Sequence, residues 1–255
     1  GCTAKEATKA EGALLPNIAE SMTRAQAEER LGWLQSELGL SDAELKKVVM
    51  RHPQMLGYSV EANMEPKLEW LQDRLDLDDA QLKMVVLSFP HLLGFSFEDN
   101  LAPTLDWLQT RLDLDDVQLR KVMGRTSVLS TSIDILESKL EWLQTRLDLD
   151  DAELRKVVLM QPQLLSFSVE ANMAPKLAYL EREIGLSRAE LREWVVKNPS
   201  ILGFSLANRY RPRLEACRAA GVDAEYVLTY VSKMDEKFYE LLEKKKDAVG
   251  ETIDE

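Results

Sequence analysis

The feature that most constrains this chain is a motif that recurs about every 37 residues. The stretch from Ser41 to Leu77 contains Pro53 and Trp70, and Pro90 and Trp107 follow at the same spacing. The Trp70 position is occupied in two further copies by Trp142 and Tyr179. A fixed period of this length is typical of solenoids, in which each repeat buries its apolar face against the next one.

Each copy carries the signals of two helices separated by a short turn. The first helix opens with a capping box, Ser41 followed by Glu44, in which each side chain satisfies a free backbone N–H of the first turn. Pro53 ends this helix, and Ser59 and Pro66 mark the start of the second. Equivalent capping boxes occur at Asp78–Gln81, Asp115–Gln118, Asp150–Glu153 and Ser187–Glu190. We therefore predict an all-α solenoid, or superhelix, of two-helix repeats joined by a short 3₁₀ turn.

The period also predicts how the chain is divided. The third copy has Ser127 and Ser138 in place of the two prolines and lacks two residues between Leu129 and Leu140, so we expect a local irregularity there. Two final helices, over Val222–Val231 and Asp235–Val249, are expected to cap the array. The predicted segments are an N-terminal tail (1–22), a helical-repeat array (23–214), C-terminal capping helices (215–249) and an acidic tail (250–255).

The composition of the chain limits the classes of function that it can have. The chain has 255 residues, of which 32 are basic and 44 acidic, for a net charge of −12. This charge opposes long-range attraction to phosphates. Apolar runs fall short of the ~18 residues that a membrane helix needs, so we expect no transmembrane segment. Cys2 and Cys217 suggest no disulfide framework, and a chain beginning at Gly1 without a basic leader is expected to be processed or truncated.

The sequence carries no recognisable catalytic motif. His52 and His91 stand at different positions of the repeat, and no Ser/His/Asp set, metal-ligand spacing or Gly-rich phosphate loop accompanies them. We therefore predict a non-enzymatic protein without a cofactor or metal.

Basic residues recur at two positions of the repeat. A ladder of Lys46, Lys83, Arg120 and Arg155 could follow a phosphate backbone. An acidic residue stands four positions earlier in each copy, however, so local ion pairs along the helix are the preferred interpretation. Those acidic residues are Asp42, Asp79, Asp116 and Asp151. A second ladder, flanked by aspartates and interpreted in the same way, comprises Arg74, Arg111 and Arg146.

The fifth copy breaks this pattern. Arg188 replaces the aspartate and stands four residues before Arg192, so the two repel rather than pair. Residues 177–213 contain seven basic and four acidic residues (7 − 4 = +3), whereas 68–104 carry two and seven (2 − 7 = −5). The strongest candidates for phosphate contact are Arg188, Arg192, Lys197, Arg209, Arg211, Arg213 and Arg218.

Aromatic residues recur too, and they could stack on bases. Because Trp70 lies between Leu68 and Leu71 on the apolar helix face, packing between repeats is the better explanation. Trp194, which replaces a valine of the earlier copies, is expected to lie in the core.

Three short motifs within the repeats resemble those of a known protein family. Residues Pro162–Ser168 read PQLLSFS, Asn172–Leu177 read NMAPKL, and Arg211–Leu214 read RPRL ahead of Gly221. This pattern, over about residues 23–249, is similar to the repeat of the mitochondrial transcription termination factor (mTERF) family. The resemblance implies a superhelix with a nucleic-acid groove on its concave side, and double-stranded DNA or RNA as partner. It also implies a role in transcription, RNA processing or ribosome assembly, in a mitochondrion or chloroplast.

A second interpretation remains open. The net charge of −12 and the nearly identical WLQ-x-RLDLDDA copies also suit an acidic protein-binding scaffold, an accessory subunit docked on a larger organellar complex. Nucleic-acid binding predicts that the C-terminal arginine side chains face the concave groove, whereas the scaffold predicts a groove that is lined by Asp and Glu or filled by a segment of a partner protein.

Overall fold

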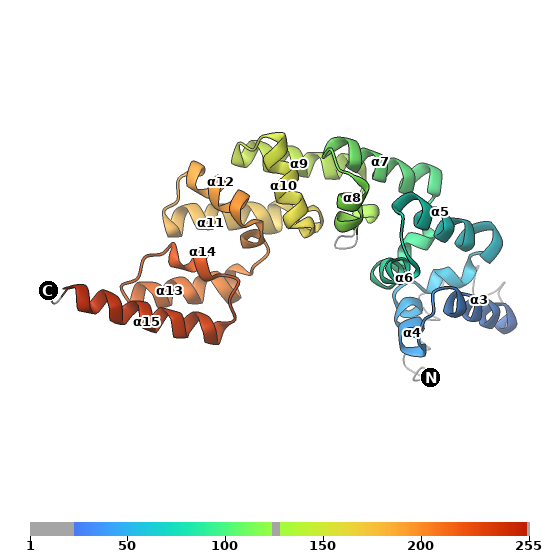
Figure 1. The fold of residues 1–255 in the computed structure, drawn as a ribbon, viewed down its shortest axis with the longest axis horizontal. Helices are drawn as coiled ribbons and strands as arrows, with labels where there is room; N and C mark the ends of the chain where they lie inside the picture. Colours follow the sequence, from blue (N-terminus) through green and yellow to red (C-terminus); the bar gives the residue numbers. More distant parts are fainter. Residues whose placement is uncertain (1–22, 124–127, 254–255) are drawn as a thin grey trace. The chain divides into compact units, whose positions relative to one another are not determined.

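The protein is mostly helical over the residues that the computed structural model describes, 23–123 and 128–253 (Figure 1). Helices follow one another in pairs joined by short 3₁₀ turns, and no strand occurs within these ranges. The prediction of an all-α helical-repeat solenoid is therefore confirmed. The predicted tail over residues 1–22 and the substitution at position 127 lie outside the described residues.

The chain divides into two compact units, with the boundary between Ile133 and Asp134. The first unit contains α3 (Arg24–Glu37), α4 (Asp42–Arg51), α5 (Glu65–Leu75), α6 (Asp79–Ser88), α7 (Ala102–Arg111) and α8 (Asp116–Met123). The second contains nearly all of α9 (Ile133–Leu147), then α10 (Asp151–Met160), α11 (Ala174–Ile184), α12 (Arg188–Lys197), α13 (Arg211–Ala219), α14 (Tyr226–Tyr230) and α15 (Asp235–Ile253).

Capping chemistry sets where the first helix of each repeat begins. In α4 the Ser41 hydroxyl accepts a hydrogen bond from the Glu44 N–H, while the Glu44 carboxylate accepts one from the Ser41 N–H at 2.9 Å. This contact, together with the ammonium of Lys83, lowers the pKa of Glu44 to about 2. The predicted capping boxes are confirmed in α4, α6, α10 and α12, and the Asp115–Gln118 pair makes the same two bonds ahead of α8.

The predicted turn and second helix are also present, with one addition. The segment Pro53–Gly57 is a 3₁₀ helix, and the Ser59 hydroxyl accepts a hydrogen bond from the Ala62 N–H at 3.2 Å. Between Ser59 and α5 lies one π-helical turn, which ends where Pro66 supplies no N–H for the helical ladder. The π-turns of the four copies are Val60–Met64, Phe97–Leu101, Val169–Met173 and Leu206–Tyr210.

The third copy is irregular, as expected. Ser138 has a backbone N–H where Pro66 has none, so helical bonding continues through this position. As a result α9 is one helix of 15 residues, whereas α5 has 11 residues and follows a π-turn. The boundary between the two units falls at the start of α9.

Two predicted boundaries near the C-terminus were wrong. Helix α14 begins at Tyr226 rather than Val222, because the Asp223 carboxylate accepts a hydrogen bond from the Glu225 N–H at 2.7 Å and forms a turn first. Helix α15 continues past Val249 to Ile253, because Gly250 weakens a helix by about 1 kcal/mol without ending it. The predicted acidic tail (250–255) is therefore part of α15 from Gly250 to Ile253.

In the first and fourth copies a buried lysine joins the second helix to the next repeat. Lys176 is 3% exposed and donates hydrogen bonds to the Leu202 carbonyl and, at 3.0 Å, to the Asn172 side-chain oxygen. Lys67 makes the equivalent bonds in the first unit, 2.5 Å from the carbonyl of Leu93. These bonds offset the cost of burying an ammonium group.

The second copy lacks this lysine. Thr104 is buried at the equivalent position, and the side-chain oxygen of Asn100 is buried without a hydrogen-bond partner among the described residues. An unpaired buried acceptor contributes nothing to hold the repeat together and carries a desolvation cost.

We expect Asn100→Leu to change the free energy of unfolding by less than about 0.5 kcal/mol, because no hydrogen bond is lost. The matched change Asn172→Leu should cost about 1–3 kcal/mol, since it removes an acceptor from the buried Lys176. Urea unfolding of both variants measures the difference. Equal losses at the two sites would contradict the assignment of an unpaired oxygen.

Candidate nucleic-acid interface

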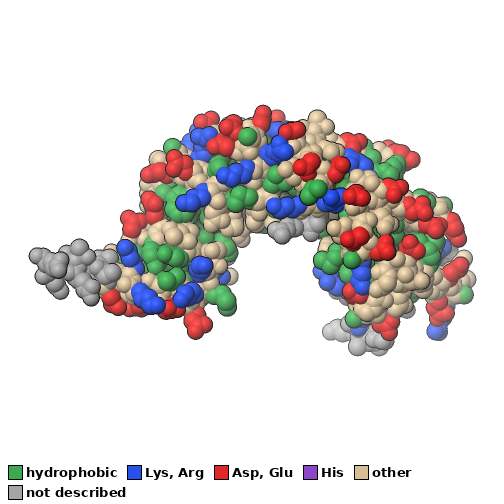
Figure 2. Space-filling model, viewed as in Figure 1, with side chains coloured by type: hydrophobic (Ala, Val, Ile, Leu, Met, Phe, Trp, Pro, Cys, Tyr) green, Lys and Arg blue, Asp and Glu red, His purple; other side chains and the backbone are tan. Residues whose placement is uncertain are grey.

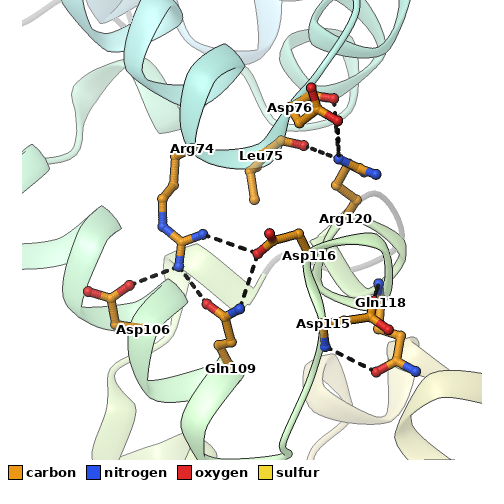
Figure 3. Close-up of polar contacts among 9 residues, drawn as sticks. All are labelled: Arg74, Leu75, Asp76, Asp106, Gln109, Asp115, Asp116, Gln118 and Arg120. Carbon is orange, nitrogen blue, oxygen red and sulfur yellow. Dashed lines mark hydrogen bonds and ion pairs between the residues drawn. The ribbon is translucent and has the colours of Figure 1, made fainter.

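The first basic ladder connects neighbouring repeats. Lys83 donates to the Gly39 carbonyl at 2.8 Å and pairs with Glu44 at 2.9 Å. Arg120 donates to the Leu75 carbonyl at 2.7 Å and pairs with the Asp76 carboxylate at 3.2 Å (Figure 3). The predicted pairs along the helix were therefore wrong at Lys83 and Arg120, because these long side chains reach carbonyls that follow or end a helix more than one repeat earlier in the chain. Lys46 and Arg155 are half-buried and also engaged in interactions.

The aspartates four residues earlier have a different partner. Each accepts a hydrogen bond from a glutamine of the preceding second helix, and Figure 3 shows one of these pairs. The pairs are Gln35–Asp42, Gln72–Asp79, Gln109–Asp116 and Gln144–Asp151, at 2.8–3.1 Å. Much of the acidity at the helix starts therefore contributes to holding the repeats together.

The second ladder also joins repeats. Arg74, at the end of α5, donates to Asp106 at 2.9 Å and to Gln109 at 2.7 Å, both in α7 (Figure 3). Arg146 of α9 pairs with Glu181 of α11 in the same way. The expected pairing with flanking aspartates is replaced by contacts across the repeat boundary, and Arg111 has interactions of its own.

The side chain of Arg213 is buried and therefore inaccessible to a phosphate. Its side chain is 1% exposed, lies 4.3 Å from the centroid of the Phe238 ring, and pairs with Asp235 at 2.7 Å. Its guanidinium also donates to three backbone carbonyls, those of Tyr230, Val231 and Lys233. Arg213 therefore holds the C-terminal helices to the last repeat and is not accessible to a phosphate.

Three other candidates are already occupied. Arg192 pairs with Glu153 at 2.7 Å, and this contact raises the pKa of its guanidinium. Arg218 pairs with Glu183 at 3.1 Å. Arg209 is half-buried and donates to the carbonyls of Val231 and Lys233. Arg192 and Arg218 are thus ion-paired within the protein, and backbone carbonyls occupy donors of Arg209.

The remaining candidates are exposed. Arg188 donates one hydrogen bond to the Thr145 carbonyl, Lys197 lies 5.8 Å from the Trp194 ring, and Arg211 lies 5.9 Å from the Tyr179 ring. These contacts leave the side chains reachable from solvent. Trp194 itself is half-buried, so its prediction as a core residue was wrong, because an indole is larger than the valines that fill this position elsewhere.

The prediction from the first basic ladder did not include a set of exposed cations that stand one residue after its members. A step of one residue turns a side chain by about 100° around the helix, from the neighbouring repeat towards solvent. The exposed cations at this second position are Lys47, Lys121 and Lys156. These lysines could have been recognised in the same alignment of the repeats, at the position directly after each ladder residue.

One groove gathers such cations in the second unit. It lies between α10 and α12, has a volume of about 290 Å³, and is lined by charged residues of both helices. Lys156 and Lys197 line it beside the Arg192–Glu153 pair, and Glu193 stands among them. On the face shown in Figure 2, Lys and Arg are interspersed with Asp and Glu rather than gathered in one continuous patch.

The aromatic ladder takes part in packing. Trp70 contacts Phe97 of the following repeat edge-on, with ring centroids 4.4 Å apart, and Tyr179 is buried. This geometry supports packing between repeats rather than stacking on bases.

Comparison with protein families identifies the chain. The mTERF family model matches residues 13–77 and 36–240. The protein belongs to the mTERF family. Its helical pairs, 3₁₀ turns and repeat junctions are thus the mTERF fold, as the resemblance in sequence implied. A search of curated proteins finds no match.

Two further properties concern the described residues only. None of their helices combines the length and hydrophobicity needed to cross a membrane. Their His, Cys, Asp and Glu side chains form no group of three or more that could hold a metal ion.

Proposed function

We propose that this mTERF protein binds double-stranded DNA or RNA through the groove between α10 and α12, in a mitochondrion or chloroplast. Members of the family are typically organellar helical-repeat proteins that bind nucleic acid and are generally not enzymes. The observation that carries the proposal is the pair of exposed lysines, Lys156 and Lys197, on the two walls of one groove. Exposed ammonium groups on adjacent helices can contact successive phosphates.

The location also fits the charge of the chain. The net charge of −12 works against long-range attraction, so binding depends on local cations. Arg188, at the start of α12, adds a third exposed cation. Regulation of transcription, RNA processing and ribosome assembly are all compatible with backbone contacts of this kind, and we propose a non-enzymatic role.

Charge reversal at the groove tests the proposal. We expect Lys156→Glu with Lys197→Glu to weaken binding to duplex DNA or RNA about tenfold or more at low salt, and to reduce the salt slope by about 2. Fluorescence anisotropy over a series of salt concentrations measures both quantities.

The matched control is Lys245→Glu with Lys246→Glu on α15, which changes the net charge equally. If both double variants weaken binding alike, the effect is one of total charge and the groove is not the site. Absence of binding by the unaltered protein at low salt would reject a nucleic-acid role.

A further inference from the structure

The first unit carries an apolar groove that the nucleic-acid proposal does not use. It lies between α6 and α8 and has a volume of about 570 Å³. Two of its side chains are large, apolar and exposed: Met84 at 63% and Val117 at 65%. Hydrophobic side chains are visible at the surface over α6 in Figure 2. Exposed apolar side chains that gather in one groove mark interaction surfaces.

The other copies of the repeat show that the fold does not need these apolar residues. The Met84 position is occupied elsewhere by Lys47, Lys121, Lys156 and Glu193. The Val117 position is alanine in every other copy, at Ala43, Ala80, Ala152 and Ala189. Because only this junction combines a large apolar residue on each wall, packing within the solenoid does not explain the pair.

The shape of the groove suits a helix. Its walls are two helices that occupy equivalent positions in successive repeats, and a third helix packs into such a depression with ridges of side chains. Apolar residues at positions i, i+3 or i+4, and i+7 of a partner helix would contact both Met84 and Val117. The flexible thioether of methionine adapts to an incoming side chain.

The charges at the rim select the partner. Lys121 is exposed at the groove, and Arg120 lines it while paired with Asp76. The acidic residue of the lining, Asp78, keeps its charge, but it lies at the N-cap of α6, where the helix dipole offsets part of that charge. Lys121 is the exposed cation of the lining that forms no ion pair within the described residues, and it complements a carboxylate.

We infer that the groove between α6 and α8 is the docking site for an acidic amphipathic helix of another protein. The apolar face of that helix covers Met84 and Val117, and one of its carboxylates lies beside Lys121. The phosphates of a nucleic acid would gain nothing from contact with the exposed apolar side chains. The first unit would thus hold a protein partner while the second contacts nucleic acid.

A helical peptide of defined composition serves as the probe. It has about 16 residues, enough to sustain a helix, with leucines on one face and glutamates at its flanks. The full chain is labelled with ¹³C at its methionine methyl groups, and the resonance of Met84 is identified from Met84→Lys. We expect the peptide to shift this resonance saturably while Met160 and Met234, which are also exposed, stay unchanged.

Substitutions copied from the chain's own repeats test the residues. Met84→Lys with Val117→Ala reproduces the side chains of other copies at exposed positions, so folding is retained, and we expect it to weaken peptide binding about tenfold or more. A peptide with lysine in place of glutamate should bind poorly to the unaltered protein. Lys121→Glu should restore its binding, which a merely structural role of Lys121 would not do.

Other outcomes overturn the inference. A shift that fails to saturate, or equal shifts at Met160 and Met234, indicates non-specific adsorption. Self-association in sedimentation that Met84→Lys with Val117→Ala abolishes identifies a second copy as the occupant. A shift of Met84 caused by duplex DNA or RNA assigns the groove to nucleic acid. None of these results depends on the lysines of the α10–α12 groove, so the two proposals fail separately.

Discussion

Replacing Arg213 by alanine is expected to lower the free energy of unfolding of the second unit by about 3–5 kcal/mol. The guanidinium donates to the carbonyl of Tyr230 at 2.9 Å, to that of Lys233 at 2.6 Å and to the Asp235 carboxylate at 2.7 Å. Alanine leaves these carbonyls without their donor. It also removes the group stacked on Phe238, so a cavity adds to the loss.

A neighbouring arginine provides the control. Arg211→Ala removes an exposed cation two residues away and should cost less than about 0.5 kcal/mol. Urea unfolding followed by tryptophan fluorescence measures the stability, and hydrogen exchange of α14 and α15 locates the change. Similar stability losses for the two variants, or unchanged exchange in α15, would show that Arg213 does not hold the C-terminal helices.

The buried Lys176 should make stability rise with pH. Burial lowers the pKa of its ammonium from the ordinary 10.5 to about 8. Between these values the unfolded chain binds a proton that the folded chain has released. Because the unfolded state then binds more protons, the free energy of unfolding increases as pH rises from 8 towards 10.5, by on the order of 2 kcal/mol in total.

Other groups titrate in the same range, so the comparison must be between variants. Burial raises the pKa of Cys217 to about 11, and it raises that of Tyr210 as well; both contribute with the opposite sign at high pH. We expect Lys176→Met to unfold with a flatter pH dependence between pH 8 and 9.5, whereas the exposed-site control Lys156→Met keeps the slope of the unaltered protein. Parallel curves for all three proteins would mean that Lys176 titrates normally when folded.

The repeat alignment predicted helix starts better than side-chain partners. A capping box such as Ser41–Glu44 is decided by atoms three residues apart, so it can be recognised in the sequence. The partner of Lys83 is Glu44, which no local pattern identifies. The same limit explains why Arg213 was predicted as a phosphate contact and proved to be buried.

The first helix of each repeat also shows that a sequence pattern does not tell which side chains are exposed. Lys46 and Lys47 are adjacent and chemically alike, yet one is half-buried and the other exposed. Which of the two faces solvent depends on the direction from which the preceding repeat approaches. The family resemblance implied nucleic-acid binding, and the orientation of the helices is what selects Lys156 and Lys197 as the residues to test.

The fold class, the repeat length, the capping boxes and the mTERF membership could be predicted from the sequence, because they follow from periodicity and from bonds within a few residues of chain. Which charges are occupied between repeats, and which remain exposed, depends on how the helices pack. Long side chains such as Arg120 find carbonyls more than 40 positions away, and the relative placement of successive helices brings those groups together. The same placement leaves Met84 and Val117 uncovered on one groove.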